Sequence, residues 1–219
     1  VLFRSKEVLC NYLGTDDFVS YAKEYLNKIK EYNTEDESYG YKSKLKIADA
    51  VWVDNNLTLQ EEFKNSVTNG FGAEVENVDF SAAEKTCGII NSWCDKNTEG
   101  LIPKIITPDL INDTTGLCLT NSLYFESGWS GEPWNVSDTE EKFGNNEKTK
   151  YMTCAGDRYY ENDKATAFGR EYANGLSFVG ILPVDEGDFT LEDLDIGGLL
   201  KSQPEYDEVQ CKMPKLDFE

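Results

Sequence analysis

The stretch Leu117–Trp129, LCLTNSLYFESGW, decides the fold of this chain. It is a run of apolar and β-favouring residues long enough to predict a strand buried on both faces, with Asn121 in its middle and Trp129 closing it after a glycine. An unpaired buried amide costs on the order of 1–3 kcal/mol, so Asn121 is predicted to join a hydrogen-bonded cluster in the middle of a sheet. A core amide that only fixes the register of the strand is an equally open interpretation.

The composition indicates a folded and strongly acidic protein. Of the 219 residues, 39% are hydrophobic, which is enough to bury a core. The chain has 41 acidic and 21 basic residues and a net charge of −20. This charge argues against nucleic acid and anionic membrane surfaces as partners. Attraction to basic proteins and simple solubility both remain open explanations of it.

The chain has no histidine, and this excludes several kinds of active site. Ser-His-Asp and Cys-His hydrolases need an imidazole base, and histidine-ligated zinc needs an imidazole nitrogen. The sequence also contains no EF-hand loop. A glycosidase with two carboxylates flanking the bond stays as an alternative of another class, although the number of acidic residues makes some close pair inevitable.

The six cysteines show no spacing typical of a disulfide framework. They contain no CxxC pair. Cys87 and Cys94 share one face of a predicted helix but lie about 10 Å apart along its axis, beyond disulfide reach. Most of the cysteines are predicted to be small core residues, so the redox compartment stays undecided. The six are Cys10, Cys87, Cys94, Cys118, Cys154 and Cys211.

The first half of the chain mixes predicted helices with predicted strands. Apolar residues recur at helical spacing over Asp16–Tyr32 and from Leu59 to Phe71, where Gly70 and Gly72 are expected to stop the helix. Ser81 and Glu84 predict a capping box that opens a further helix, ending near Thr98–Gly100. The other predicted elements are a polar linker at Thr34–Gly40, strands at Leu45–Val53 and Ala73–Phe80, and an irregular connection over Leu101–Gly116.

The second half is predicted to be rich in strands. Asn174-Gly175 is a strong hairpin signal between two of them. Pro214 interrupts the last alternating stretch, which suggests an edge strand or a bulge. Helices and strands followed by mostly strands indicate an α+β fold. The predicted strands are Thr149–Cys154, Tyr159–Tyr172, Leu176–Leu182 and Val209–Phe218, with a short helix within Thr190–Ser202.

These segments together resemble the serpin family over Lys6–Glu219. Leu117–Trp129 is similar to the strand 3A pattern L-x-N-A-x-Y-F-K-G-x-W, with Asn121, Tyr124, Phe125 and Trp129 in place. Each motif is weak alone, whereas their order and spacing together are specific. The other matches are Leu45–Val53 (strand 2A), Ala73–Phe80 (strand 1A), Ile90–Ile102 (helix F and its exit), Asp138–Phe143, Ser177–Pro183 (the strand ending I-L-P) and Met213–Leu216 (the L-P-K-F motif of strand 6A).

The chain departs from the family pattern at individual positions. Ser122 stands where alanine is usual, Asp49 where asparagine is common, and Trp134 where the pattern has phenylalanine. The last is a volume change that a core can accommodate. None of the three departures breaks the resemblance.

The resemblance implies an α+β fold with a large central mixed sheet, sheet A, together with helices and the further sheets B and C. Compared with the family, the first helices and helix B are missing upstream, and strand 5A, the reactive-centre loop and the last strands of sheets B and C are missing downstream. The chain is therefore expected to be truncated at both ends. Val1–Ser5 (VLFRS) is interpreted as a sequencing scar, and Lys6–Glu219 as part of a single serpin domain.

The resemblance implies that the full-length parent inhibits a serine or cysteine protease as a suicide substrate. The protease cuts an exposed loop, and the cut loop inserts into sheet A as a new strand. The alternative is a non-inhibitory serpin that acts as a binding or chaperone-like protein. No enzymatic activity, cofactor, metal site, nucleic acid or membrane partner is expected. The parent is expected to be a secreted, extracellular monomer, and this chain does not specify its target protease.

The resemblance also assigns roles to individual residues. Asn121 belongs to the shutter, where the strands of sheet A part, and Trp129 belongs to the breach, where the loop first enters, with Thr139 near it. The helix Ser81–Thr98 lies across sheet A, and Asn91, Trp93 and Thr98 are its expected packing residues. On residue type alone, Trp129 is as readily a plain core aromatic. Because sheet A lacks a central strand here, the isolated chain is expected to aggregate.

Overall fold

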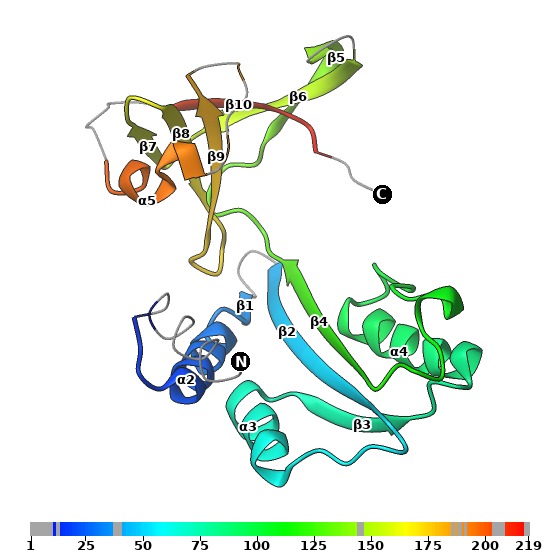
Figure 1. Cartoon of the computed structure of the whole chain (residues 1–219). Helices are drawn as coiled ribbons and strands as arrows, with labels where there is room; N and C mark the ends of the chain where they lie inside the picture. Colours follow the sequence, from blue (N-terminus) through cyan, green and yellow to red (C-terminus); the bar gives the residue numbers. More distant parts are fainter. Residues whose placement is uncertain are drawn as a thin grey trace. The chain divides into compact units, whose positions relative to one another are not determined.

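The computed structural model describes residues 11, 14–36, 41–143, 147–184, 187, 190, 192–202 and 209–216. The chain divides into two compact units, Val1–Glu126 and Ser127–Glu219, whose elements are labelled in Figure 1. Each unit has strand pairings and a buried core of its own. The predicted scar Val1–Ser5 lies outside the described residues.

The first unit is built on a mixed sheet with β2 (Tyr41–Asp54) at its centre. β4 (Leu117–Glu126) pairs with β2 antiparallel, and β3 (Glu74–Val78) pairs in parallel with the last residues of β2. Both faces of β2 are covered over the segment from Ala50 to Val53, whose residues are 1–4% exposed. The strands predicted for this half are confirmed.

Helices α2 (Phe18–Lys30) and α3 (Glu61–Phe71) also belong to this unit, and the rings of Phe18 and Phe71 lie 5.3 Å apart. α3 ends at Gly72, whose φ of 66° is the left-handed conformation that glycine adopts at little cost. The prediction that Gly70 also stops this helix is wrong. Gly70 is buried inside α3, where a Cβ atom would collide with Cγ1 of Val19. The close approach of α2, rather than a helix end, therefore explains this glycine.

A further helix of the unit, α4 (Ala83–Asn97), lies against one face of the sheet (Figure 1). The capping box predicted at Ser81 and Glu84 is not formed, because the N-cap position is Ala82. The carboxylate of Asp79 competes for Ser81: its Oδ1 accepts hydrogen bonds from the Ser81 hydroxyl at 2.5 Å and from the Ser81 N–H at 3.0 Å. The helix therefore starts one residue later than predicted. Its predicted end at Thr98 is confirmed.

The segments around these elements differ from the prediction at one place. The predicted linker Thr34–Gly40 contains a short strand, β1 (Thr34–Asp36), that pairs antiparallel with the first residues of β2. The two strands are joined by backbone hydrogen bonds, and the polar side chains of this segment gave no indication that these bonds form. The predicted irregular connection Leu101–Gly116 is confirmed and includes the 3₁₀ turn η1 (Pro108–Leu110).

The second unit contains two antiparallel sheets. Together with the mixed sheet of the first unit, they confirm the predicted α+β fold. The strand order is β10 (Gln210–Pro214), β6 (Glu147–Ala155), β5 (Asn135–Phe143) in one sheet and β7 (Arg158–Glu161), β8 (Ala165–Glu171), β9 (Ser177–Pro183) in the other.

One long strand predicted in this unit, Tyr159–Tyr172, is in fact two strands. β7 and β8 are joined by a turn in which Oδ1 of Asn162 accepts hydrogen bonds from the N–H groups of Lys164 and Ala165, at 2.9 and 2.8 Å. The hairpin predicted at Asn174-Gly175 is confirmed, since β8 and β9 pair on either side of it and Gly175 has a φ of 84°.

Short helical turns cover the β7–β8–β9 sheet. The helix predicted within Thr190–Ser202 is present as η2 (Glu192–Leu194) and α5 (Ile196–Leu199). Leu194 and Leu199 pack there against Tyr160, Ala165 and Ala167. β10 ends at Pro214, the residue predicted to interrupt it. Residues 217–218 of that predicted strand lie outside the described part of the chain.

Candidate functional site

Asn121 lies in the middle of β4, on the face of the sheet opposite to α4. Its partner across the strands is Asp49 of β2, and Asn121 Nδ2 donates a hydrogen bond to Asp49 Oδ1 at 2.9 Å. Both residues line a depression of about 330 Å³ together with Val67 and Phe71 of α3. The prediction of a strand buried on both faces is wrong at this face, because Asn121 is exposed. The predicted hydrogen-bonded partner is present, in the form of an exposed pair of side chains.

The other face of the sheet is buried under α4. Trp52 of β2 is 1% exposed, and its ring meets Trp93 of α4 edge to face at 6.2 Å. Trp52 Nε1 donates to Thr120 Oγ1 of β4 at 3.0 Å, so one side chain ties both strands to the helix. The buried cluster around it also contains Ala50, Val78, Phe80, Cys87, Ile90, Cys94, Ile106 and Ile111.

The three residues predicted to pack α4 on the sheet have different surroundings. Trp93 contacts the sheet through Trp52. Asn91 instead binds the segment that follows the helix: its Nδ2 donates to Ile106 O at 2.9 Å, and its Oδ1 accepts from the N–H of Ile105 and of Ile106. Thr98 caps the helix, since its Oγ1 donates to Cys94 O and accepts from the N–H of Ile102. Asn91 and Thr98 thus hold the exit of α4 in place.

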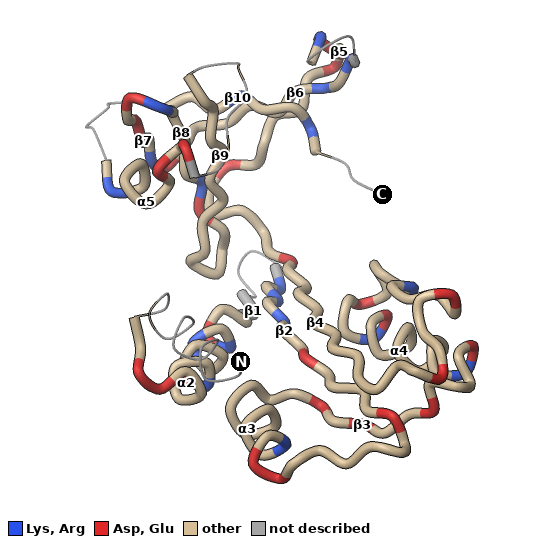
Figure 2. Tube along the Cα trace, viewed as in Figure 1, with Lys and Arg blue, Asp and Glu red and all other residues tan. Residues whose placement is uncertain are grey.

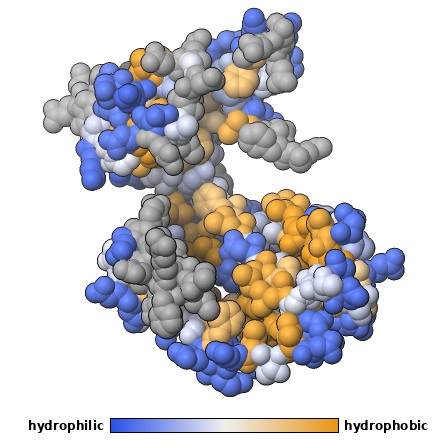
Figure 3. Space-filling model, in the orientation of Figure 1, coloured by the Kyte–Doolittle hydropathy of each residue, from blue (hydrophilic) through white to orange (hydrophobic). Residues whose placement is uncertain are grey.

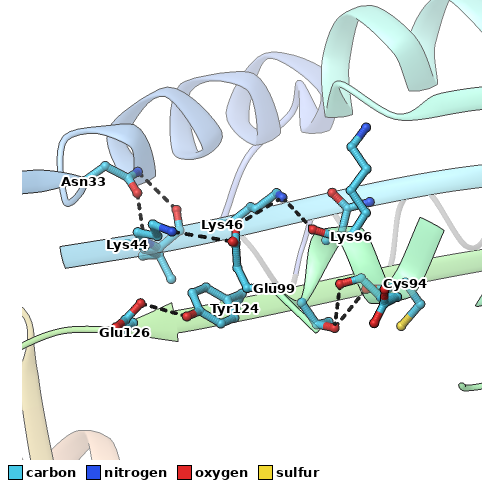
Figure 4. A network of polar contacts seen from close by, with 12 residues as sticks. Asn33, Lys44, Lys46, Cys94, Lys96, Glu99, Tyr124 and Glu126 are labelled. Carbon is cyan, nitrogen blue, oxygen red and sulfur yellow. Dashed lines mark hydrogen bonds and ion pairs between the residues drawn. The ribbon is translucent and has the colours of Figure 1, made fainter. Parts of the chain in front are cut away.

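A polar network joins the end of α4 to the first half of β2 (Figure 4). Lysines follow one another at alternate positions along β2 (Figure 2). Two of them, Lys44 and Lys46, place Nζ 3.5 and 3.9 Å from the carboxylate of Glu99. Lys46 Nζ also donates to Lys96 O at 3.2 Å. Glu99 has a φ of 53°, a left-handed conformation that is costly for a residue with a Cβ atom.

Trp129 lies in an aromatic cluster of the second unit. Its ring stacks on Tyr172 at 4.3 Å and an interplanar angle of 18°, and the two residues form an isolated β-bridge. Trp134 and Phe178 meet the Trp129 ring edge to face at 5.6 and 6.0 Å. Thr139 lies in β5, where the pairing with β6 shifts register between Val136 and Glu140, and its side chain is exposed.

Arg170 is a functional candidate that the sequence analysis did not identify. It is 2% exposed, and its guanidinium carbon lies 5.9 Å from the ring centre of Trp129 and 5.5 Å from that of Trp134. It donates hydrogen bonds to the backbone oxygens of Glu132 and Ala155, while its Nε has no partner among the described residues. The available signal was a single basic residue, Arg170, in the strand ATAFGRE, whose preceding residues are small or apolar apart from Thr166.

The described residues give no indication of a metal or a membrane span. Within them, no three His, Cys, Asp or Glu side chains gather in an arrangement that could hold a metal ion. None of the helices found there combines the length and the apolar character needed to cross a bilayer.

Sequence comparison places the chain among known proteins. The family model described as "Serpin (serine protease inhibitor)" matches residues 5–219. The curated protein Serpin-ZX of Hordeum vulgare is 30% identical over 178 residues, which cover 76% of this chain and 44% of that protein. An uncharacterized serpin-like protein of Methanosarcina acetivorans is 28% identical over 209 residues, covering 88% of this chain and 48% of that protein. The chain thus spans about half the length of these relatives.

Solved structures share the fold. Ovalbumin from emu (Dromaius novaehollandiae) matches with a TM-score of 0.71 at 18% identity, over 88% of this chain and 52% of that one. Reaction-loop-cleaved lamprey angiotensinogen matches with a TM-score of 0.72 at 20% identity, over 97% of this chain and 64% of that one.

Proposed function

Because the chain belongs to the serpin family, we propose that its full-length parent is a protease inhibitor that traps a serine or cysteine protease by inserting a cleaved loop into the sheet of β2, β3 and β4. The target protease cuts an exposed loop and forms an acyl-enzyme, and insertion of the loop as a new strand distorts the protease before the acyl bond is hydrolysed. The protein itself then acts as a suicide substrate and needs no cofactor. The family includes secreted proteins, and we place the parent outside the cell as a monomer.

The observation that carries this proposal is the free edge of β4. β4 is 10 residues long and pairs with β2 along its whole length, from Leu117 to Glu126, which lies opposite Lys44. In the described ranges, no strand pairs with its other edge. An edge of this length presents a row of backbone N–H and C=O groups that an added strand can satisfy. The same edge would accept the inserted loop.

Insertion next to β4 requires α4 to move, and the contacts of α4 define what resists that movement. The apolar part is the packing of Trp93 on Trp52. The polar part is the ion pairing of Glu99 with Lys44 and Lys46. We propose that these contacts keep the sheet closed until the loop enters.

The remaining predicted site residues fit the same proposal. Asn121 and Asp49 join the two strands on the open face, where a hydrogen bond between side chains can be exchanged as the strands move. The stacked pair Trp129 and Tyr172 would mark the breach. Thr139 is proposed to lie near the breach on family resemblance alone.

The decisive experiment uses the full-length parent and a panel of serine and cysteine proteases. Inhibition of this type produces a covalent complex that survives denaturing electrophoresis. If only cleaved protein appears with every protease, the inhibitory proposal fails and the non-inhibitory binding or chaperone-like alternative stands.

A variant tests the role assigned to α4. Glu99→Gln removes the charge that holds Lys44 and Lys46, so faster formation of the covalent complex is expected. Ser92→Ala is the matched control, because Ser92 is an exposed residue of α4, the helix that Glu99 follows, and its hydroxyl bonds only within that helix, to Gly88 O at 2.7 Å. Equal rates for the two variants would contradict a resisting role of Glu99.

A further inference from the structure

Two cysteines of the second unit face each other across neighbouring strands. Cys154 of β6 and Cys211 of β10 are register partners in the antiparallel pairing. Directly opposed residues in such a pair have Cα atoms about 4.5–5.5 Å apart, which lies within the range of about 4.4–6.8 Å that a disulfide spans. The strands therefore hold the sulfur atoms together before any bond forms.

The surroundings give the two thiols different access to solvent. Cys211 is 3% exposed, and its Sγ lies only 2.6 Å from where a Cβ would stand on Gly156, so this glycine makes room for the sulfur. Cys154 is half-buried. Both cysteines line a surface depression of about 460 Å³, with polar neighbours that include Thr153, Gln210 and Lys212, and Cys154 is the more exposed of the two. A small molecule can reach Cys154 from this depression.

Burial affects the two thiols to different extents, and the positive charge of Arg170 acts on both. Burial raises the pKa of Cys154, and the positive charge of Arg170 offsets only part of that rise. Burial raises the pKa of Cys211 to about 12, with the neighbouring Cys154 adding to the effect. Arg170 forms no ion pair with a carboxylate of the described residues, so its charge is available to a thiolate at Cys154.

We propose that Cys154 and Cys211 form a reactive dithiol that exchanges with disulfides of small thiols and closes to a cross-strand disulfide. The Cys154 thiolate attacks one sulfur of the small disulfide, forming a mixed disulfide and releasing one thiolate. The released thiolate takes the proton of Cys211, whose sulfur then attacks Cys154 Sγ and releases the second small thiol. The protein loses two electrons and two protons, and the small disulfide gains them as two thiols.

The product would tie β10 to β6 covalently. The loop that it closes contains β7, β8, β9 and α5. It would also alter the surroundings of Arg170, because the ionisable Cys154 thiol near its guanidinium would be replaced by a neutral disulfide sulfur. This inference does not depend on the proposed inhibitory function.

The test is incubation of the reduced full chain with glutathione disulfide, followed by alkylation of the remaining thiols and peptide mapping without reduction. A peptide linked through Cys154 and Cys211 is expected as the first and main disulfide. Its absence while Cys154 stays reduced, or a link from Cys154 to another cysteine, would overturn the proposal.

Two variants check the order of the steps, with Cys118→Ser as the matched control. Cys211→Ser should stop at one glutathionyl group on Cys154, because the resolving thiol is gone. Cys154→Ser should leave Cys211 reduced. Cys118→Ser should form the linked peptide like the wild type, since Cys118 pairs with Trp52 and not with another cysteine. Faster glutathionylation of Cys211 than of Cys154 would contradict the assigned roles.

Discussion

Two polar side chains of β4, those of Thr120 and Ser122, have opposite effects on the stability of the fold. Thr120 accepts a hydrogen bond from the buried Trp52 Nε1. Ser122, two residues further on the same face, is 5% exposed, and its hydroxyl has no partner in the part of the chain that the structure describes. A buried polar group without a partner keeps its full cost of leaving water.

We therefore expect Ser122→Ala to raise the free energy of unfolding by about 1 kcal/mol, because it removes an unpaired hydroxyl at little change in volume. Thr120→Val should lower it by about 1–3 kcal/mol, because it leaves Trp52 Nε1 buried without an acceptor. Urea denaturation of both variants measures the two values. Destabilisation by Ser122→Ala would show that its hydroxyl has a partner after all.

The buried thiol of Cys211 predicts a loss of stability in alkaline solution. Its pKa rises from 9.0 to about 12 in the folded chain, chiefly through burial. Well below pH 9, the Cys211 thiol is protonated in both the folded and the unfolded state. The full contribution of this thiol to the stability of the fold is then present. As the pH rises from 9 to about 12, the unfolded state releases the proton first and is favoured. Cys211→Ala should weaken this loss when urea midpoints are followed over that range in a reducing buffer, and an unchanged slope would contradict it.

At the scale of single residues, the sequence predicted that Asn121, a residue of a family motif, has a hydrogen-bond partner. It did not predict the pairing of two cysteines that belong to no motif. Asn121 was identified as an amide that needs a partner, and Asp49 is that partner. The exposure of Asn121 was not predicted, because a run of apolar residues does not show which face of the strand another element covers. Cys154 and Cys211 are far apart in sequence, so only the register of β6 and β10 could bring them together.

Among the elements, α4 shows most clearly how one helix face holds a sheet. Ile90 is fully buried in the cluster with Trp52 and Phe80, whereas the adjacent Ile89 is 37% exposed. Cys87 and Cys94, which the sequence predicted to share one face of this helix, both lie in the same buried cluster. The start of the helix was mispredicted, because the carboxylate of Asp79 binds the serine that would have capped it.

Replacing these two isoleucines separates core packing from helix propensity. Ile90→Ala should cost about 2–5 kcal/mol of stability, because it leaves a cavity between α4 and the sheet. Ile89→Ala should change stability by no more than about 0.5 kcal/mol, since its side chain largely faces solvent. Denaturation followed by far-UV circular dichroism compares the two, and equal losses would contradict the assigned burial.

On the scale of the whole molecule, the first unit exposes apolar surface beside Asn121. Leu119 is 65% exposed and Leu123 59%, and Figure 3 shows hydrophobic surface over the sheet between α3 and α4. Exposed apolar faces and long free strand edges favour association with other chains. The expectation that this chain aggregates thus has a specific surface to test.

The double variant Leu119→Lys, Leu123→Lys should reduce self-association of the chain in sedimentation velocity, because two charges would be buried in any contact through this face. Leu182→Lys is the control: Leu182 is 69% exposed but belongs to β9 of the second unit. If the control reduces association as much as the double variant, the face of β4 is not the contact surface.

The fold of the whole chain was largely predictable, because the ordered motifs fix which strands exist and which family they belong to. The motifs did not predict strand pairings that depend on the backbone alone, such as that of β1 with the start of β2. The division of Tyr159–Tyr172 was also missed, because the asparagine that makes the turn lies inside an otherwise strand-like stretch.

The four tryptophans of the chain form two pairs, each within one unit. Trp52 and Trp93 meet edge to face at 6.2 Å, and Trp129 and Trp134 at 5.6 Å. Indole rings this close couple their electronic transitions, so each pair carries a near-ultraviolet circular dichroism signal that disappears when the pair separates. In a chain in which one pair is replaced by phenylalanine, the remaining tryptophan signal therefore reports on the other unit alone. The first pair would report displacement of α4, and the second would report changes beside Arg170.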